Sequence, residues 1–264
     1  MCALSAGEVL LAFGAAGLFA LTLHTEQLAA FEPTVIQYDV YRVAFDAHTD
    51  TLLLLVLPPP PANSNLSNNT DFSMLWLVSL RRNGSEWLEV HRLNTNLSDY
   101  NVKVAACDSR VLLGKSGGDT LNVFEVSVAH SLRALASVTM QNEFNTFACT
   151  NRDGDTLVAL SHETWVSVQP LASLPQSHVP LASVDFTDSD GLLFRGDLML
   201  VADWNSDTDT HAIVSLRASG NALKEWQVLL DAETSVWVWA WALAGDKLVL
   251  YDHVSGDLLI YKLE

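Results

Sequence analysis

A recurring apolar hairpin is the feature that most constrains how this chain can fold. Its second strand returns six times, and most copies are entered through a turn of Gly, Asp, Ser or Thr. The copies read LFALTL, LWLVSL, LNVFEV, WVSV, AIVSL and LLIYKL. A unit that cannot cover both of its faces alone must stack against copies of itself. The recurrence therefore predicts a repeat architecture.

The spacing of the copies indicates which repeat this is. The last apolar residues of the copies are Leu23, Leu80, Val126, Val168, Leu216 and Leu263. Apart from the first interval, which is longer, they are separated by about 45 residues, the length of a four-stranded propeller blade. The apolar runs are short and rich in Val, Leu, Trp and Phe, and they lack the i, i+3, i+4 pattern of helical repeats. We therefore expect an all-β propeller of six four-stranded blades with no long helix.

The blades are expected within one domain over residues 1–264. Their approximate limits are 1–34, 35–98, 99–140, 141–186, 187–232 and 233–264. The long first interval contains residues 58–71, PPPPANSNLSNNTD, which we interpret as a disordered loop insertion. A docking role for the proline stretch is the alternative. The stretch from Val9 to Leu23 imitates a signal peptide, but we interpret it as two strands of the first blade.

The last copy lacks an outer strand in the sequence. A propeller joins its first and last blades, because an open sheet edge invites aggregation. Either the segment from Met1 to Ala6 supplies the missing strand, or the native chain continues past Glu264. We favour the second alternative, in which this chain is an N-terminal piece of a larger protein.

The segments GDTLNVFEV and GDLLIYKLE resemble the blade segment that ends in Trp-Asp in WD-repeat-like β-propellers. The resemblance extends over nearly the whole chain. Phe124-Glu125 and Tyr261-Lys262 stand where that family has its Trp-Asp pair. The resemblance implies a propeller like the N-terminal propellers of large scaffolds, such as coat, nucleoporin-like or checkpoint-assembly subunits.

The chain carries a formal net charge of −17. Such a field repels phosphate backbones and anionic lipid, so we expect no direct nucleic-acid partner. The apolar stretch from Val9 to Leu23 is too short to cross a bilayer, so we expect no membrane span. The acidity has two possible roles. It only keeps an apolar chain soluble, or it attracts a protein partner with a basic segment. The three cysteines, Cys2, Cys107 and Cys149, are an odd number without Cys-x-x-Cys spacing, so neither a disulfide framework nor a zinc site is indicated. We interpret Cys107 and Cys149 as small buried hydrophobes. This interpretation predicts a reducing, intracellular location in the cytoplasm or nucleus.

Four Asn-x-Ser/Thr sequons favour the opposite, secreted location. They begin at Asn65, Asn68, Asn83 and Asn96. We interpret them as chance matches in a stretch rich in Asn and Ser.

No nucleophile elbow, P-loop, dinucleotide fingerprint or His-Glu-x-x-His motif occurs in the sequence. The best acidic cluster contains Asp203, Asp207 and Asp209 and imitates the start of a calcium loop. Thr208 and Val214 stand where such a loop needs Gly and Glu, which favours a solvated turn. The segment VWVWAW, residues 236–241, places three indoles on one face of a strand, as expected where one blade packs on the next. A ligand-stacking platform is the alternative.

His162, His211 and His253 fall in or beside the same hairpin of successive copies. They line one rim of the propeller or reflect ordinary turn composition. With the three aspartates above they form the candidate partner-binding set. We expect neither a catalytic residue, a cofactor nor a metal.

These features predict a non-catalytic protein–protein interaction scaffold, a propeller module of a multi-subunit assembly that binds a basic or extended peptide segment. One alternative is an enzyme of the six-bladed calcium-dependent hydrolase kind. That enzyme needs inward-facing oxygens on several inner strands, where only Asn145 is a plausible ligand. The other alternative is a secreted, glycosylated propeller.

Overall fold

The fold is an all-β, six-bladed propeller, as the repeat predicts. It was obtained as a computed structural model of the chain. The structure describes residues 1–13, 16–31, 39–57, 74–98, 101–162, 165–174, 182–185, 189–195, 198–205, 210–219, 222–230, 236 and 238–263. Within this part the only helix is the single turn η2 (Leu171–Ser173). The predicted insertion at residues 58–71 lies outside the described residues.

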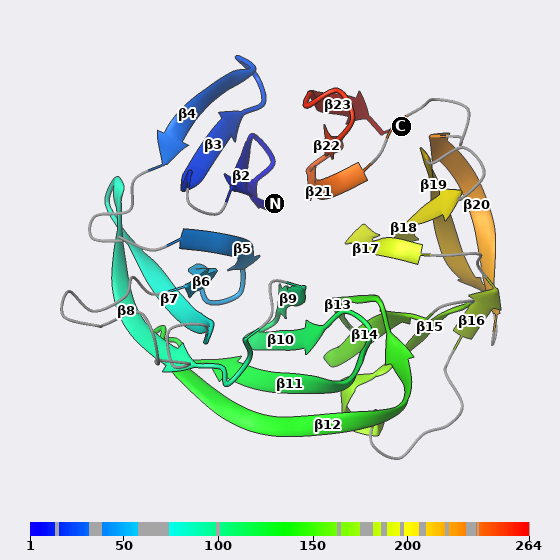
Figure 1. Cartoon of the computed structure of the whole chain (residues 1–264), viewed down its shortest axis with the longest axis horizontal. Coiled ribbons are helices and arrows are strands. Elements are labelled where there is room, and N and C mark those ends of the chain that lie inside the picture. The colour runs from blue at the N-terminus through cyan, green and yellow to red at the C-terminus, as the bar shows by residue number, and fades with distance from the viewer. Residues whose placement is uncertain are drawn as a thin grey trace, which may run out of the picture. The chain divides into compact units, whose positions relative to one another are not determined.

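The first three blades are antiparallel sheets of four strands in chain order (Figure 1). The first blade contains β1 (Cys2–Ser5), β2 (Glu8–Ala12), β3 (Leu18–Thr22) and β4 (Gln27–Phe31). The second contains β5 (Asp39–Asp46), β6 (Thr51–Leu57), β7 (Trp76–Asn83) and β8 (Glu86–Asn94). The third contains β9 (Val102–Cys107), β10 (Arg110–Lys115), β11 (Gly118–Val126) and β12 (Leu132–Phe144).

The fourth and fifth blades are joined into one sheet of eight strands. The fourth contains β13 (Thr146–Arg152), β14 (Asp155–Ser161), β15 (Trp165–Pro170) and β16 (Ala182–Asp185). The fifth contains β17 (Ser189–Arg195), β18 (Leu198–Asn205), β19 (Thr210–Ser219) and β20 (Ala222–Leu230). The outer strands β16 and β20 pair in parallel, with Ser183 opposite Ala222. In the sixth blade the described strands are β21 (Val238–Ala244), β22 (Lys247–Asp252) and β23 (Leu258–Lys262).

The segment at the start of the chain belongs to the first blade. The residues from Val9 to Leu23 contribute the two strands β2 and β3, as predicted. Cys2 pairs with Leu10, so β1 is the strand next to β2. The alternative in which Met1 to Ala6 completes the last blade is therefore wrong. A four-residue strand with one apolar alternation is too short for sequence periodicity to identify.

The chain divides into two compact units, which are described separately. Unit 1 contains residues 1–113 and 123–136, and unit 2 contains residues 114–122 and 137–264. The prediction of one domain over residues 1–264 is not tested by this division and stays a prediction.

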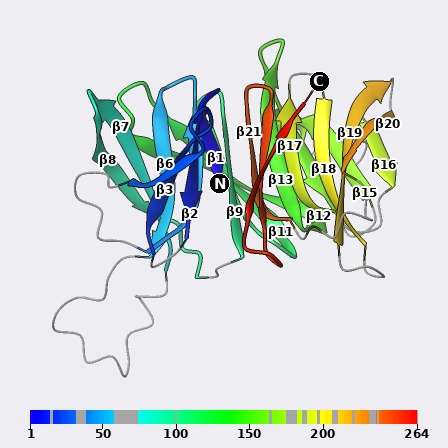
Figure 2. The ribbon, with the colours of Figure 1, turned by 90° about the horizontal axis from the view of Figure 1, so that it is seen from above.

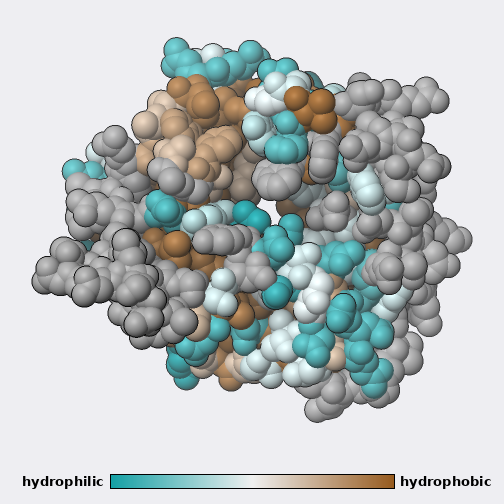
Figure 3. All heavy atoms as spheres, viewed as in Figure 1, coloured by the Kyte–Doolittle hydropathy of each residue, from teal (hydrophilic) through white to brown (hydrophobic). Residues whose placement is uncertain are grey.

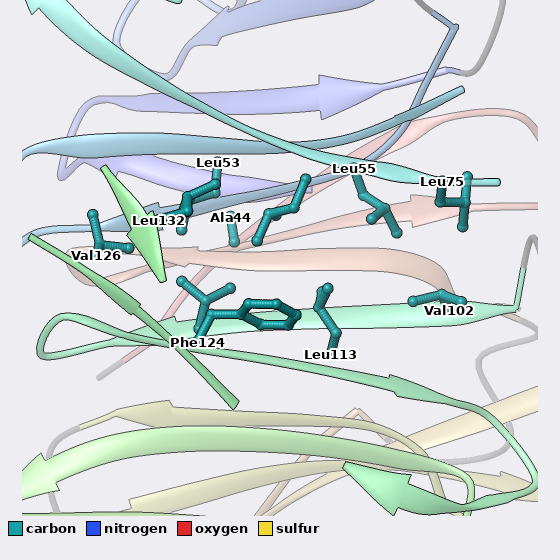
Figure 4. Packing of buried hydrophobic residues seen from close by; sticks show 11 residues of the cluster. Ala44, Leu53, Leu55, Leu75, Val102, Leu113, Phe124, Val126 and Leu132 are labelled. Carbon is teal, nitrogen blue, oxygen red and sulfur yellow. The ribbon is translucent and has the colours of Figure 1, made fainter. Parts of the chain in front are cut away.

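The second strand of a blade is buried on both of its faces. In unit 1, β6 reads TLLLLVL, and Leu53 and Leu55 belong to one apolar cluster while Leu52 and Leu54 belong to another. Side chains alternate between the two faces of a strand, so each cluster covers one face. Figure 4 shows the first cluster, in which Phe124 of β11 packs with residues of β6 and β10. Figure 2 shows β6, β7 and β8 running side by side in this blade.

The same alternation organises unit 2. Met199 and Val201 of β18 belong to one apolar cluster, and Leu200 and Ala202 belong to another. A continuous apolar strand of this kind is expected wherever both faces of a sheet are covered. The stacking inferred from the repeat is therefore visible residue by residue within each unit.

The outer strands differ from these buried strands. All residues of β4 except Phe31 are exposed, and Leu28 is 48% exposed. On the face shown in Figure 3, apolar atoms gather over the β3–β4 hairpin. Burial therefore decreases from the second strand of the blade to the fourth.

Replacing a leucine of β6 tests the double burial of that strand. Leu54 is 0% exposed, so Leu54→Ala should lower the free energy of unfolding by about 2–5 kcal/mol through lost burial and a residual cavity. Leu135→Ala, at a position that is 41% exposed, should change it by less than about 0.5 kcal/mol. Urea unfolding followed by tryptophan fluorescence measures both values. Equal losses for the two variants would contradict the assignment.

Candidate functional site

The three histidines of the predicted set lie at equivalent places in unit 2. His162 follows β14, His211 is the second residue of β19, and His253 lies in the turn after β22. His162 and His253 thus lie in the connection between the second and third strands of a blade, and His211 lies at the start of the third strand. Their equivalence is therefore confirmed, while a role in partner binding stays a prediction.

The aspartates of the predicted set are only partly described. Asp203 is half-buried in β18, opposite Ala212 of β19. Asp207 and Asp209 lie outside the described residues. The structure therefore brings no acidic cluster together here within its described part.

His162 is held by two contacts. Its Nδ1 lies 2.8 Å from the carbonyl oxygen of Glu143, and its ring stacks on Trp165 with centroids 3.8 Å apart and planes inclined by 15°. A carbonyl oxygen only accepts hydrogen bonds, so Nδ1 must carry the proton and donate it. In the neutral ring the lone pair is then on Nε2.

Burial controls the charge of this histidine. The side chain of His162 is 5% exposed, and removal from water lowers its pKa below the ordinary value of 6.5. The hydrogen bond to Glu143 opposes this shift and is the weaker effect. His162 is therefore neutral at neutral pH, with a fixed tautomer and a basic Nε2.

Nε2 of His162 is buried without a hydrogen-bond partner, and so is Oγ of Ser167 in β15. Buried polar atoms are usually satisfied, so unsatisfied ones need an explanation. Ser167 lies two residues from Trp165 on a regular strand and therefore shares the face on which the imidazole stacks. We call His162, Trp165 and Ser167 the His162 site. Sequence reasoning named His162 but missed the other two, which the alternation of WVSV could have identified.

His211 has the opposite tautomer. Its Nδ1 accepts a hydrogen bond from the backbone N–H of Val238 at 3.1 Å, and the backbone N–H of His211 donates to the carbonyl oxygen of Val236 at 2.9 Å. An Nδ1 that accepts leaves the proton of the neutral ring on Nε2. His211 is 0% exposed and ties β19 to the start of the sixth blade. Equivalent places in two blades thus hold histidines with different chemistry.

A second buried polar network, in unit 1, has its bonds satisfied. Asp46 is 1% exposed and accepts hydrogen bonds from Oγ1 of Thr49 at 2.6 Å and from the backbone N–H of Ser109 at 3.2 Å. Thr51 continues the network from Thr49 to Nδ1 of His130, each at 2.8 Å. A fully bonded network of this kind fixes the loops that it joins. We therefore assign it to the fold and not to a binding site.

The predicted indole row is described only at Trp241. A Cβ added to Gly191 of β17 would lie 2.9 Å from the indole of Trp241, so the ring lies directly on the glycine backbone. Trp241 also packs against the apolar cluster that contains Leu200 and Leu250. It thus packs one blade on the next, as expected. Trp237 and the side chain of Trp239 lie outside the described residues.

The described residues contain no group of three or more His, Cys, Asp or Glu side chains that could hold a metal ion. The calcium site of the hydrolase alternative therefore finds no ligand set in this part of the chain. No helix in the same part is long and apolar enough to cross a membrane.

The interpretation of two cysteines as isolated hydrophobes is wrong. Cys107 of β9 and Cys149 of β13 form a disulfide, and Cys2 is free. These cysteines occupy equivalent strands of consecutive blades, and their distance in the sequence conceals the pairing. Disulfides persist in oxidising compartments and are rare in the cytosol. The disulfide therefore contradicts the predicted intracellular location.

No protein-family model and no curated protein matches the sequence. Solved structures do match it. A chain of a mitotic checkpoint complex is 12% identical with a TM-score of 0.62, over 99% of this chain and 86% of that one. The periplasmic gluconolactonase of Pseudomonas aeruginosa is 14% identical with a TM-score of 0.60, over 96% and 81%. A Bacteroides uniformis protein assigned as a 6-phosphogluconolactonase is 12% identical with a TM-score of 0.61, over 98% and 79%.

These likenesses show the fold and correct three expectations. Because the matched propellers include lactonases, the predictions of a non-catalytic scaffold and of a chain that is no enzyme are contradicted. The periplasmic location of one match agrees with the disulfide against an intracellular protein. The prediction of a basic or extended peptide partner, without nucleic acid, is not tested and stays a prediction.

The buried His162 should make the protein less stable as the pH falls below 6.5. Between pH 6.5 and the lower pKa of folded His162, the unfolded chain binds a proton that the folded chain does not. The free energy of unfolding should therefore fall as pH falls from 6.5, and His162→Gln should reduce this slope. Urea unfolding between about pH 5 and 8 measures this slope, because most carboxylates titrate below that range and contribute little to it. The exposed His24→Gln should keep the wild-type slope, and an unchanged slope in His162→Gln would contradict the assignment.

Proposed function

We propose that this protein is a propeller hydrolase that opens lactone rings, with His162 as the general base. The observation that carries the proposal is the geometry of His162, a neutral imidazole whose tautomer leaves a basic and unpartnered Nε2. Support also comes from the solved propellers described as gluconolactonase and 6-phosphogluconolactonase. Their names refer to those proteins, and the activity is carried to this chain only as a proposal.

Nε2 of His162 is buried, so a local opening would have to admit water and the lactone to it. Nε2 would then take a proton from the water molecule as the water oxygen adds to the carbonyl carbon of the lactone. The bond between that carbon and the ring oxygen then breaks, and the ring oxygen receives the proton from the imidazolium. The product is the open-chain hydroxy acid. The hydrogen bond to Glu143 would stabilise the imidazolium, because its Nδ1–H donates throughout.

Two further groups of the His162 site support this chemistry. The indole of Trp165 holds the imidazole plane by stacking, so the direction of the Nε2 lone pair is fixed. The hydroxyl of Ser167 has no hydrogen-bond partner and lies on the same face of β15 as Trp165.

The charge of the protein favours a neutral substrate. The net charge is −17, and most of the excess of acidic residues lies in unit 2, which contains His162. A negative field of this kind lowers the local concentration of anions. We therefore propose a neutral sugar lactone and not a phosphorylated one.

The WD-repeat-like subfamily remains part of the proposal. It is supported by the likeness to the checkpoint-complex chain and by the blade strand β11 that GDTLNVFEV forms. The residues Phe124-Glu125 in place of Trp-Asp distinguish this chain within that group.

A lactonase assay tests the function. Hydrolysis of glucono-δ-lactone, corrected for the spontaneous reaction, should lose about 10²–10⁴-fold in kcat in His162→Gln, the usual contribution of a general base. The wild-type rate should fall as pH decreases through a pKa below 6.5, because the base must be unprotonated. The phosphorylated lactone should be the poorer substrate at low ionic strength.

The exposed His24→Gln serves as the control and should keep the wild-type rate. Circular dichroism must show that His162→Gln is folded before its rate is interpreted. Wild-type protein that hydrolyses neither lactone, or a folded His162→Gln with the wild-type rate, would overturn the proposal.

A further inference from the structure

The turn between β7 and β8 presents a complete glycosylation sequon. Asn83 pairs with Glu86, so Gly84 and Ser85 form a two-residue hairpin loop. Gly84 has φ 64, and glycine at the first central position is typical of a type II′ turn. Asn83, Gly84 and Ser85 are all exposed. The acceptor amide and the hydroxyl two residues later therefore lie together at the tip of an outer hairpin.

The neighbouring side chains leave the amide of Asn83 clear. Trp87 is buried in the core of unit 1, and the guanidinium of Arg82 lies 5.0 Å from its ring centroid. Adjacent positions of a strand point to opposite faces, so Asn83 points away from the face occupied by Arg82. A glycan on Asn83 would thus displace no packed side chain.

A second sequon follows β8. Asn96 is exposed, and so is Ser98. The chain on both sides of Asn96 is anchored, because Oγ1 of Thr95 donates to the carbonyl oxygen of Leu75 at 2.7 Å and the N–H of Leu75 donates to Leu97 at 2.7 Å. Asn96 itself has φ 58, a left-handed conformation that asparagine tolerates. The local structure therefore holds the backbone and leaves the acceptor side chain at the surface.

We propose that Asn83 and Asn96 are N-glycosylation sites. Sequons are used only on the secretory route, and the disulfide between Cys107 and Cys149 places the chain in an oxidising compartment independently of the sequons. Exposed acceptors and an oxidising location are the two conditions under which a sequon can be used. The correction of the predicted location thus changes the meaning of these motifs.

The modification is a group transfer from a lipid diphosphate-linked oligosaccharide. The side-chain nitrogen of Asn83 or Asn96 attacks C1 of the first sugar, and an N–C1 bond forms. The bond from C1 to the phosphate oxygen breaks, the lipid diphosphate leaves, and the amide nitrogen gives up one proton. Nothing is oxidised or reduced.

Expression of the full chain behind a cleavable secretory leader in cultured animal cells tests the proposal. Asn65→Gln and Asn68→Gln remove the two other sequons from the background. Peptide mapping before and after glycosidase treatment should show sugar on Asn83 and Asn96. Asn83→Gln and Ser85→Ala should each abolish the sugar at residue 83, and Asn96→Gln and Ser98→Ala should do the same at residue 96.

The serine variants keep the asparagines, so they separate loss of the sequon from damage to a turn. Asn101→Gln, an exposed asparagine outside any sequon, is the matched control and should leave the glycan pattern unchanged. The same background expressed in the cytosol should carry no sugar. An unmodified asparagine in folded, secreted protein would overturn the assignment at that residue.

Discussion

The structure depends on strands that are apolar on both faces. A strand such as β6, TLLLLVL, cannot expose either side to water without losing much of the hydrophobic free energy that burial provides. The side chains on its two faces belong to two separate apolar clusters. The side chains of β18 in unit 2 are divided between two clusters in the same way. Each blade must therefore be covered twice, and a sequence that repeats the blade supplies the cover from its own copies.

The fold was predictable because strands buried on both faces appear in the sequence as short continuous apolar runs bounded by turn residues. The segment GDTLNVFEV forms the single strand β11, and Ser116 and Gly117 form the turn before it. The strand β1 was not predicted, because four residues carry too little periodicity. The disulfide was not predicted either, since the spacing of Cys107 and Cys149 in the sequence carries no pairing signal.

The candidate site was predicted in place but not in chemistry. The sequence identified His162 and His211 as equivalent residues of successive hairpins, and the structure agrees. What separates them is the atom opposite Nδ1, which is a carbonyl oxygen for His162 and a backbone N–H for His211. Both partners belong to the backbone, where residue identity carries no information. A tautomer, and with it the capacity to act as a base, therefore cannot be predicted from residue type and spacing.

The parallel contact between β16 and β20 has a consequence for how the fourth and fifth blades open. An isolated blade ends in an outer strand whose backbone amides exchange with solvent whenever that strand frays. Here Ser183 pairs with Ala222, so neither outer strand can peel away without breaking a link to the neighbouring blade. The two blades are thus joined into one sheet, and we expect slower amide exchange where β16 meets β20 than along the exposed β4.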